Sequence, residues 1–249
     1  MKDDRKPGYY GSVKVGADTD GGYQASGNIN YSSSKVDAYA NLNYRNREFK
    51  GGGITSRLNT TDNSFLDQTN DSKRQHNNWF GRFGATWHIT KSDDLAFNVT
   101  GMTGGGDNSE NIHYNSIDSQ KNTIYTSDRI TNGDSDMKMY NLELNYVHKF
   151  SENSNIDLMV SNNQWRRDGM NIFRQSTVYT DPSQIANPLY QTQENDIKDK
   201  TWEVQADYTN KISDMARIEA GYKGTFQRNA SPVDTYTGTT AEDIRQDES

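Results

Sequence analysis

The sequence predicts an all-β protein: an antiparallel up-and-down meander of about nine strands forming part of a transmembrane outer-membrane β-barrel. Three observations predict this class. Successive segments alternate apolar and polar side chains, their connections are alternately short and long, and aromatic residues gather at the ends of the apolar faces. Alternation places apolar side chains on one face of a strand and polar side chains on the other. Short turns at one end and long loops at the other are typical of outer-membrane barrels.

The alternating segments lie, in chain order, at 9–15, 23–31, 36–44, 79–89, 95–100, 140–150, 156–160, 202–208 and 218–226. The first alternates weakly, and the second and third combine small central residues with tyrosines at the ends. The fourth has tryptophan near both ends, the fifth is a Leu-x-Phe-x-Val run, and the sixth begins Tyr-Asn-Leu-Glu-Leu-Asn-Tyr. The seventh is Ile-x-Leu-x-Val. The eighth and ninth set aromatic and apolar residues against Glu, Gln, Arg and Lys.

The connections divide into two kinds. Short polar stretches rich in Ser, Asp, Asn and Gly favour tight turns, at 18–22, 32–34, 90–94, 151–155 and 211–214. Long polar stretches at approximately 46–78, 103–136 and 163–200 are predicted as outer loops, and 229–249 as a truncated outer loop. In a simple meander these long stretches all fall on one side of the sheet, as a membrane barrel requires.

A soluble β-sandwich is the main alternative, because its strands also alternate. Its inner faces would be rich in Val, Ile and Leu. Here the middle of the apolar face is often Ala or Gly, and Tyr or Trp stands near its ends, as at Trp79 and Trp87. Tyr and Trp favour the membrane interface because they have one apolar and one polar end. The barrel is therefore the preferred interpretation.

The amino-acid composition excludes several classes of function. Only 31% of the 249 residues are hydrophobic, yet 11% are aromatic, a combination that suits a thin apolar band with a polar lumen and polar loops. The net charge of −7 argues against a nucleic-acid partner, and the absence of cysteine excludes thiol chemistry. No apolar run is long enough for a membrane helix. No secretory signal follows Met1, so we expect the chain to be a piece of a longer protein.

The polar stretches contain the only candidate chemistry. His76 near Asp71, and His113 near Asp107, lie on the side where a protease dyad would have to form, but their spacing does not support pairing, so we expect no enzyme and no catalytic residues. Segments 107–110 and 134–136 offer oxygen ligands without a complete calcium loop, so we expect no metal and no cofactor. Candidate ligand-binding residues, which could stack on a sugar or hold an anionic chelate, are Trp165, Arg166, Arg167 and Tyr190.

Four short motifs carry a family resemblance. They are GYYGSVKVG at 8–16, TDGGY at 19–23, GNINY at 27–31 and LNYR at 42–45. Together they resemble the start of the barrel in the TonB-dependent receptor-like outer membrane β-barrel family of Bacteroidetes. In that family a G-x-x-G-S-V strand follows the plug domain and N-Y-R enters the first long loop. The later strands are similar to the family in style, with looser motifs.

The resemblance implies a barrel of about 22 strands in the cell outer membrane of a Gram-negative bacterium. It also implies an N-terminal plug and energy from an inner-membrane TonB complex. Residues 1–8 look like a remnant of the plug-to-barrel junction, and 9–228 like the first barrel strands, with the plug absent. The implied partners are membrane lipid, the parent plug, the remaining strands and the TonB complex.

The implied function is part of the wall of a receptor that imports a large solute, such as a ferric chelate, a cobalamin-like molecule or an oligosaccharide. A barrel that binds or anchors without energised transport, and a soluble β-sandwich binding module, remain as alternatives. A wall of nine strands alone would leave open edges in lipid, so we do not expect it to insert and transport by itself.

Overall fold

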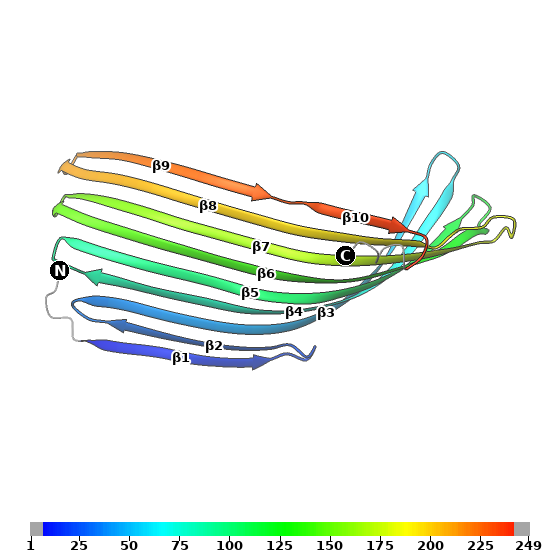
Figure 1. Cartoon of the computed structure of the whole chain (residues 1–249), viewed down its shortest axis with the longest axis horizontal. Coiled ribbons are helices and arrows are strands. Elements are labelled where there is room, and N and C mark those ends of the chain that lie inside the picture. Colours follow the sequence, from blue (N-terminus) through cyan, green and yellow to red (C-terminus); the bar gives the residue numbers. More distant parts are fainter. Residues whose placement is uncertain (1–6, 242–249) are drawn as a thin grey trace.

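A computed structural model of the chain describes residues 7–241 and contains one antiparallel sheet of ten strands (Figure 1). The strands are β1 (Gly8–Ala17), β2 (Tyr23–Ser32), β3 (Val36–Asn59), β4 (Ser64–His88), β5 (Asp93–Ile117), β6 (Thr123–Ser151), β7 (Ser154–Tyr179), β8 (Leu189–Ser213), β9 (Ala216–Ala230) and β10 (Val233–Gly238). Neighbours in sequence are neighbours in the sheet from β1 to β8, which confirms the predicted meander. No helix in residues 7–241 is long and apolar enough to cross a membrane.

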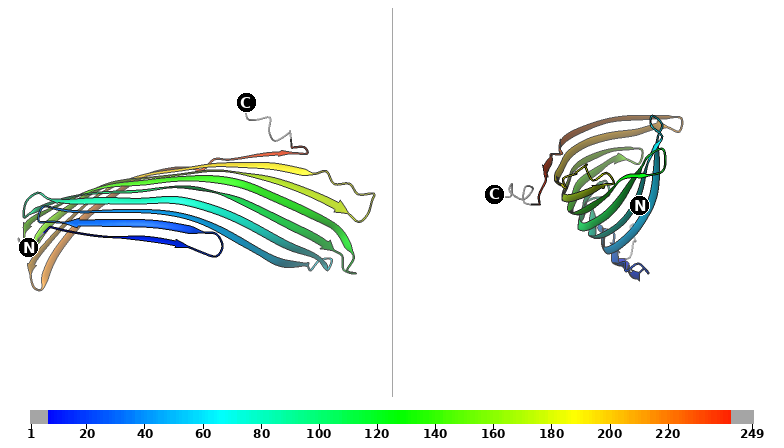
Figure 2. Two further views of the ribbon diagram at one scale, coloured as in Figure 1. Left: turned by 90° about the horizontal axis from the view of Figure 1, so that it is seen from below. Right: turned by 90° about the vertical axis from the view of Figure 1, so that its right-hand side faces the viewer.

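The sheet is a single curved layer, and within residues 7–241 no second sheet covers either face (Figure 2). Each strand contacts only the strands with which it pairs, and the described residues contain no buried hydrophobic side chain. The few buried side chains are polar, such as Ser127 and Thr131. A sandwich needs an apolar core between two layers, so the soluble-sandwich alternative is wrong for this fold.

The two faces of the sheet differ in exposure as well as in chemistry. On β6, Leu142 and Leu144 are 40% and 44% exposed, whereas Asn141, Glu143 and Asn145 beside them are more shielded. Side chains converge on the concave side of a curved sheet, so the polar set faces inward and the apolar set faces outward. This arrangement is the reverse of a water-soluble protein and is the one expected for a barrel wall in lipid.

Aromatic residues close the outward apolar band at both ends on three strands: Trp79 and Trp87 on β4, Tyr140 and Tyr146 on β6, and Trp202 and Tyr208 on β8. Eight residue steps on β4 cover about 27 Å of strand. With a tilt of about 40° this length spans roughly 20 Å of membrane, close to the band of known barrels. The ladder connects Trp79 to Lys198, four residues before Trp202, so the band crosses the ladder obliquely, as tilted strands require.

The prediction of long outer loops is wrong. The stretches 46–78, 103–136 and 163–200 are mostly strand, since β3 to β8 each continue far beyond the band and turn only at 60–63, 118–122 and 180–188. Outside lipid a strand needs no apolar face, because water solvates both sides while the ladder satisfies the backbone. Because these extensions are mostly polar, apolar and polar side chains do not alternate along them, and the sequence pattern did not predict strands there.

The last predicted loop is also partly strand. β9 and β10 both pair with β8 and are separated only by Ser231 and Pro232, so together they continue one edge of the ladder. Pro232 has no N–H to donate, although its carbonyl accepts a 3.3 Å hydrogen bond from the Asp196 amide. The predicted loop at 229–249 therefore contains β10, and 242–249 lies outside the described residues. Of the predicted junction 1–8, only Pro7 and Gly8 are described, and Gly8 begins β1.

Candidate functional site

The inward face is the concave face of the sheet, which would line the lumen of a closed barrel. At the outer end of the apolar band it carries a row of four apolar side chains in direct register on β4 to β7: Phe80, Met102, Met139 and Trp165. Cross-strand partners have Cβ atoms about 5 Å apart. The four side chains, here called the inner apolar row, therefore form a continuous strip on a mostly polar wall. Thioether and aromatic groups adapt well to irregular apolar surfaces.

A network of polar side chains adjoins the inner apolar row on its membrane side. The Tyr39 hydroxyl donates a 2.9 Å hydrogen bond to the Asn98 side chain, and the Asn98 amide donates at 3.0 Å to Glu143. The Tyr39 ring crosses over β4 at Gly84, where an added Cβ would lie 2.4 Å from the ring. Arg82 stacks over the same ring at 5.3 Å. This network keeps the inner wall polar and ordered below the inner apolar row.

The four residues predicted to bind ligand do not converge. Trp165 and Arg167 face inward on β7, whereas Arg166 and Tyr190 belong to the outward face. Tyr190 is the register partner of Arg174, which stacks over its ring at 5.8 Å. Eight residues separate Arg166 from Arg174, or about 27 Å of extended strand. Only Trp165 lies in the inner apolar row, whose other members sequence reasoning missed because they belong to different strands.

The histidines of the strand extensions do not pair as their sequence neighbours suggested. His113 Nδ1 lies 2.7 Å from Asp128 on the adjacent strand, and both side chains are more than half exposed on the outward face. His76 lies on the inward face, opposite Gly106. His113 meets Asp128 because of the pairing register of β5 and β6, which cannot be read from spacing along the chain.

The two acidic segments lie close together but face different ways. Asp107 and Asp134 are outward register partners, while Glu110 faces inward. Within residues 7–241 no group of three His, Asp or Glu residues has the arrangement of a metal site. Farther along the same outward face, Asp136, Asp168 and Asp196 are in register on β6, β7 and β8. A hydrogen bond from the Lys198 ammonium holds the pKa of Asp196 below its usual value.

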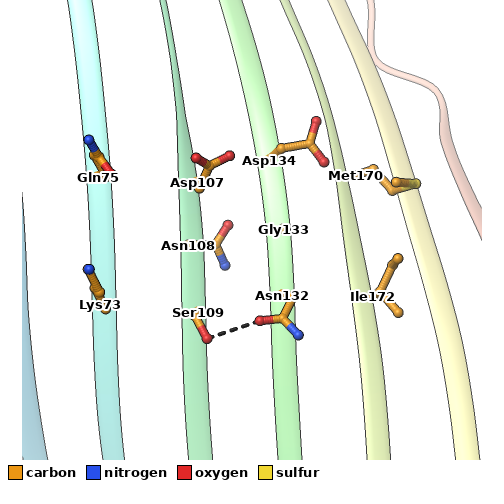
Figure 3. A pocket seen from close by; sticks show the side chains of 10 residues that line it. All are labelled: Lys73, Gln75, Asp107, Asn108, Ser109, Asn132, Gly133, Asp134, Met170 and Ile172. Carbon is orange, nitrogen blue, oxygen red and sulfur yellow. Dashed lines mark hydrogen bonds between the residues drawn. The ribbon is translucent and has the colours of Figure 1, made fainter.

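A shallow hollow of about 410 Å³ lies on the outward face of the extensions, over β4 to β7 (Figure 3). It is lined by Lys73, Gln75, Asp107, Asn108, Ser109, Asn132, Gly133, Asp134, Met170 and Ile172. Ser109 donates a 3.0 Å hydrogen bond to Asn132 across its floor. The lining is an open strip of parallel side chains rather than an enclosed cleft, so it supplies no convergent set of reacting groups.

The short-turn end of the wall carries a compact polar network. On the inward face His88 lies 2.6 Å from Asp94 and 3.1 Å from Asp37, and Lys149 donates to Asp94 at 3.1 Å. On the outward face Asp93 accepts hydrogen bonds from Tyr146 and His148, at 2.6 and 2.7 Å. His88 therefore faces inward and His148 outward. These contacts tie β3 to β6 together at the short-turn rim.

Residues 152–249 match the model of the Outer membrane protein beta-barrel family. The outward apolar band and the single-layer meander already described agree with this match, which covers β7 to β10. The chain is the wall of an outer-membrane β-barrel. It therefore lies in the cell outer membrane, with the band in contact with lipid.

No curated protein sequence matches the chain. Among solved structures, the crystal structure of the Pseudomonas putida toluene transporter TodX is 10% identical in sequence over 94% of this chain and 88% of that one. Its TM-score is 0.24, which is too low to support any argument about fold or function.

Proposed function

We propose that this outer-membrane wall belongs to a TonB-dependent receptor that imports a large solute, such as a ferric chelate, a cobalamin-like molecule or an oligosaccharide. The motifs of β1, β2 and β3, which resemble the barrel start of that family, support the proposal. In this scheme a plug domain fills the lumen and an inner-membrane complex supplies energy. Further strands complete the barrel, because an open sheet edge in lipid leaves backbone groups unsatisfied.

The observation that carries the proposal is the height of the wall. β3 to β8 contain 24 to 29 residues each, whereas about ten suffice to cross the membrane. More than half of each strand therefore projects outside the lipid as a polar funnel. A tall funnel favours capture of a bulky solute before it enters the lumen, and the inner apolar row lies where the funnel meets the membrane.

We assign the inner apolar row to solute contact. Trp165 and Phe80 stand at its two ends, with two methionines between them, so the row can cover the flat face of a sugar, a macrocycle or an aromatic chelator. Arg167 lies two residues from Trp165 on the same face and can hold an anionic group. The row binds and orients in this scheme, and we propose no catalytic step for the wall.

Uptake assays test the proposal. A strain lacking the gene for this chain is compared with its parent for uptake of a radiolabelled ferric chelate, cyanocobalamin and a fluorescent oligosaccharide. The proposal expects loss of uptake of one solute, and the same loss when the proton gradient of the parent is collapsed. Uptake that needs the gene but survives an uncoupler would favour the non-energised binding barrel. No dependence on the gene would contradict both.

A further inference from the structure

Five outward cations gather at the outer edge of the apolar band on β6 to β9: Lys138, Arg166, Lys198, Lys200 and Arg228, here called the basic belt. Lys138, Arg166 and Lys198 are direct register partners on three adjacent strands, and Lys200 is the register partner of Arg228. Like charges directly opposite each other destabilise a sheet. The arrangement therefore calls for negative charge from elsewhere.

The belt is placed with respect to the membrane by the aromatic residues. Lys138, Lys200 and Arg228 each stand two residues beyond the last outward aromatic of their own strand, which is Tyr140, Trp202 or Phe226. Two residues are about 7 Å of strand. Aromatic girdles mark the headgroup level, so these three side chains lie among or just above the headgroups of the outer leaflet.

The charges of the belt are only partly compensated. Arg166 lies 3.3 Å from both Asp168 and Asp196, and Lys198 pairs with Asp196. These acids are in the next row away from the membrane. By contrast, Lys138, Lys200 and Arg228 are exposed and make no ion pair within residues 7–241.

The register explains why Lys200 and Arg228 lack an acidic partner. The same-face neighbours of Lys200 on the flanking strands are Gln164 and Arg228, and those along β8 are Lys198 and Trp202. None of these is acidic. The uncompensated side of the belt therefore faces the membrane, and the compensated side faces water.

We propose that the basic belt binds the phosphate groups of a phosphorylated glycolipid in the outer leaflet. Lysine and arginine are the natural donors to phosphate, and basic clusters at a membrane surface attract anionic headgroups. The acyl chains would lie along the band below the belt, beside Tyr140 and Trp202, while the sugar lies toward the acidic row. The inference uses the outward face alone and does not depend on the transport proposal.

The test uses the purified outer-membrane protein that contains this chain, in zwitterionic detergent with EDTA to remove bridging cations. Binding is measured by native mass spectrometry and by titration with fluorescent lipid A, a bis-phosphorylated glycolipid. Dephosphorylated lipid A and phosphatidylcholine are compared, and inorganic phosphate is the competitor. The variant combines Lys138→Gln, Lys200→Gln and Arg228→Gln. The control, Lys14→Gln with Arg217→Gln and Lys223→Gln, removes the same charge from the inward face.

Each belt cation is expected to contribute about fivefold to lipid A affinity, so the belt variant should bind roughly a hundredfold more weakly. The control should bind within about twofold of the unmodified protein, and dephosphorylation of the lipid should reproduce the loss. Heat-modifiable migration of both variants on gels verifies folding. Equal affinity of the unmodified protein and the belt variant would overturn the proposal. So would an equal loss in the control, or displacement of lipid A by inorganic phosphate at similar concentration.

Discussion

A charge placed on the outward face should be far more damaging than the same charge on the inward face of the same strand. Leu144 stands between Tyr140 and Tyr146 on β6 and is flanked by Phe97 and Val160 on the adjacent strands. Leu144→Arg would set a guanidinium near the middle of the lipid band. Three residues away, Asn141→Arg adds the same group to the polar inward face. The two variants introduce the same side chain on the same strand and differ in the face on which it lies.

An outward arginine near the membrane midplane costs about 2–4 kcal/mol. At 1.4 kcal/mol for each factor of ten, this lowers the ratio of folded to unfolded protein by about 30-fold to 700-fold. For Asn141→Arg the expected change is close to zero, because the group enters water. The two free energies of unfolding are measured by urea titration in liposomes, followed by tryptophan fluorescence. Equal losses in the two variants, or a larger loss for Asn141→Arg, would refute the assignment of the faces.

Three other results are expected. Gly84→Ala should destabilise the wall by about 1–3 kcal/mol in the same urea titration, because its Cβ would lie 2.4 Å from both the Tyr39 ring and the Asn98 side-chain oxygen. It should cost much less in a Tyr39→Ala background, which removes the ring and also the hydroxyl that holds Asn98 in place. Trp165→Ala should raise the half-saturation concentration for uptake several-fold while the amount of protein in the outer membrane stays constant. The amide of Asn122 donates to the Asp118 carboxylate, which lowers the pKa of Asp118. Stability from this lowered pKa is present at neutral pH and lost in acid, so hydrogen-exchange protection of the Asn122 amide should stay constant down to about pH 4 and fall below it.

Each of these expectations has an outcome that would contradict it. Equal destabilisation by Gly84→Ala with and without the Tyr39 ring would mean that the ring is not the obstruction. Unchanged half-saturation in Trp165→Ala would remove the inner apolar row from solute contact. Loss of protection at Asn122 already between pH 7 and 5 would exclude Asp118 as the titrating group.

The membrane-spanning part of the fold could be predicted from the sequence because lipid imposes a local rule on each strand. Alternation from Tyr140 to Tyr146 identifies an outward face without knowledge of any partner strand. The extensions escaped the prediction because water imposes no such rule. The run Gly104-Gly105-Gly106 looks like a loop in sequence, yet it lies within β5 and pairs with β4 and β6.

The candidate site could be predicted only where one residue was informative alone. Trp165 was selected for its chemistry, and it does face the lumen. Met139 and Met102 were not, because their proximity to Trp165 depends on the pairing register of three strands. Arg166 was grouped with Trp165 because the two are adjacent in sequence, but adjacent residues of a strand point to opposite faces. Tyr190 lies about 27 Å from Arg166 along the wall, because the register pairs it with Arg174, eight residues farther along β7.

One stretch of β6 spans lipid and the next stands in water. The chain contains no cysteine, so single cysteines can be introduced along β6 from Asn132 to Tyr146 without a background signal. A spin label at each position, in liposomes, reports contact with lipid-soluble oxygen against a water-soluble nickel chelate. We predict a period of two from Tyr140 to Tyr146, with even positions in lipid, and water access at both parities from Asn132 to Lys138. Uniform water access along the whole stretch, or lipid contact at odd positions, would contradict this placement of β6.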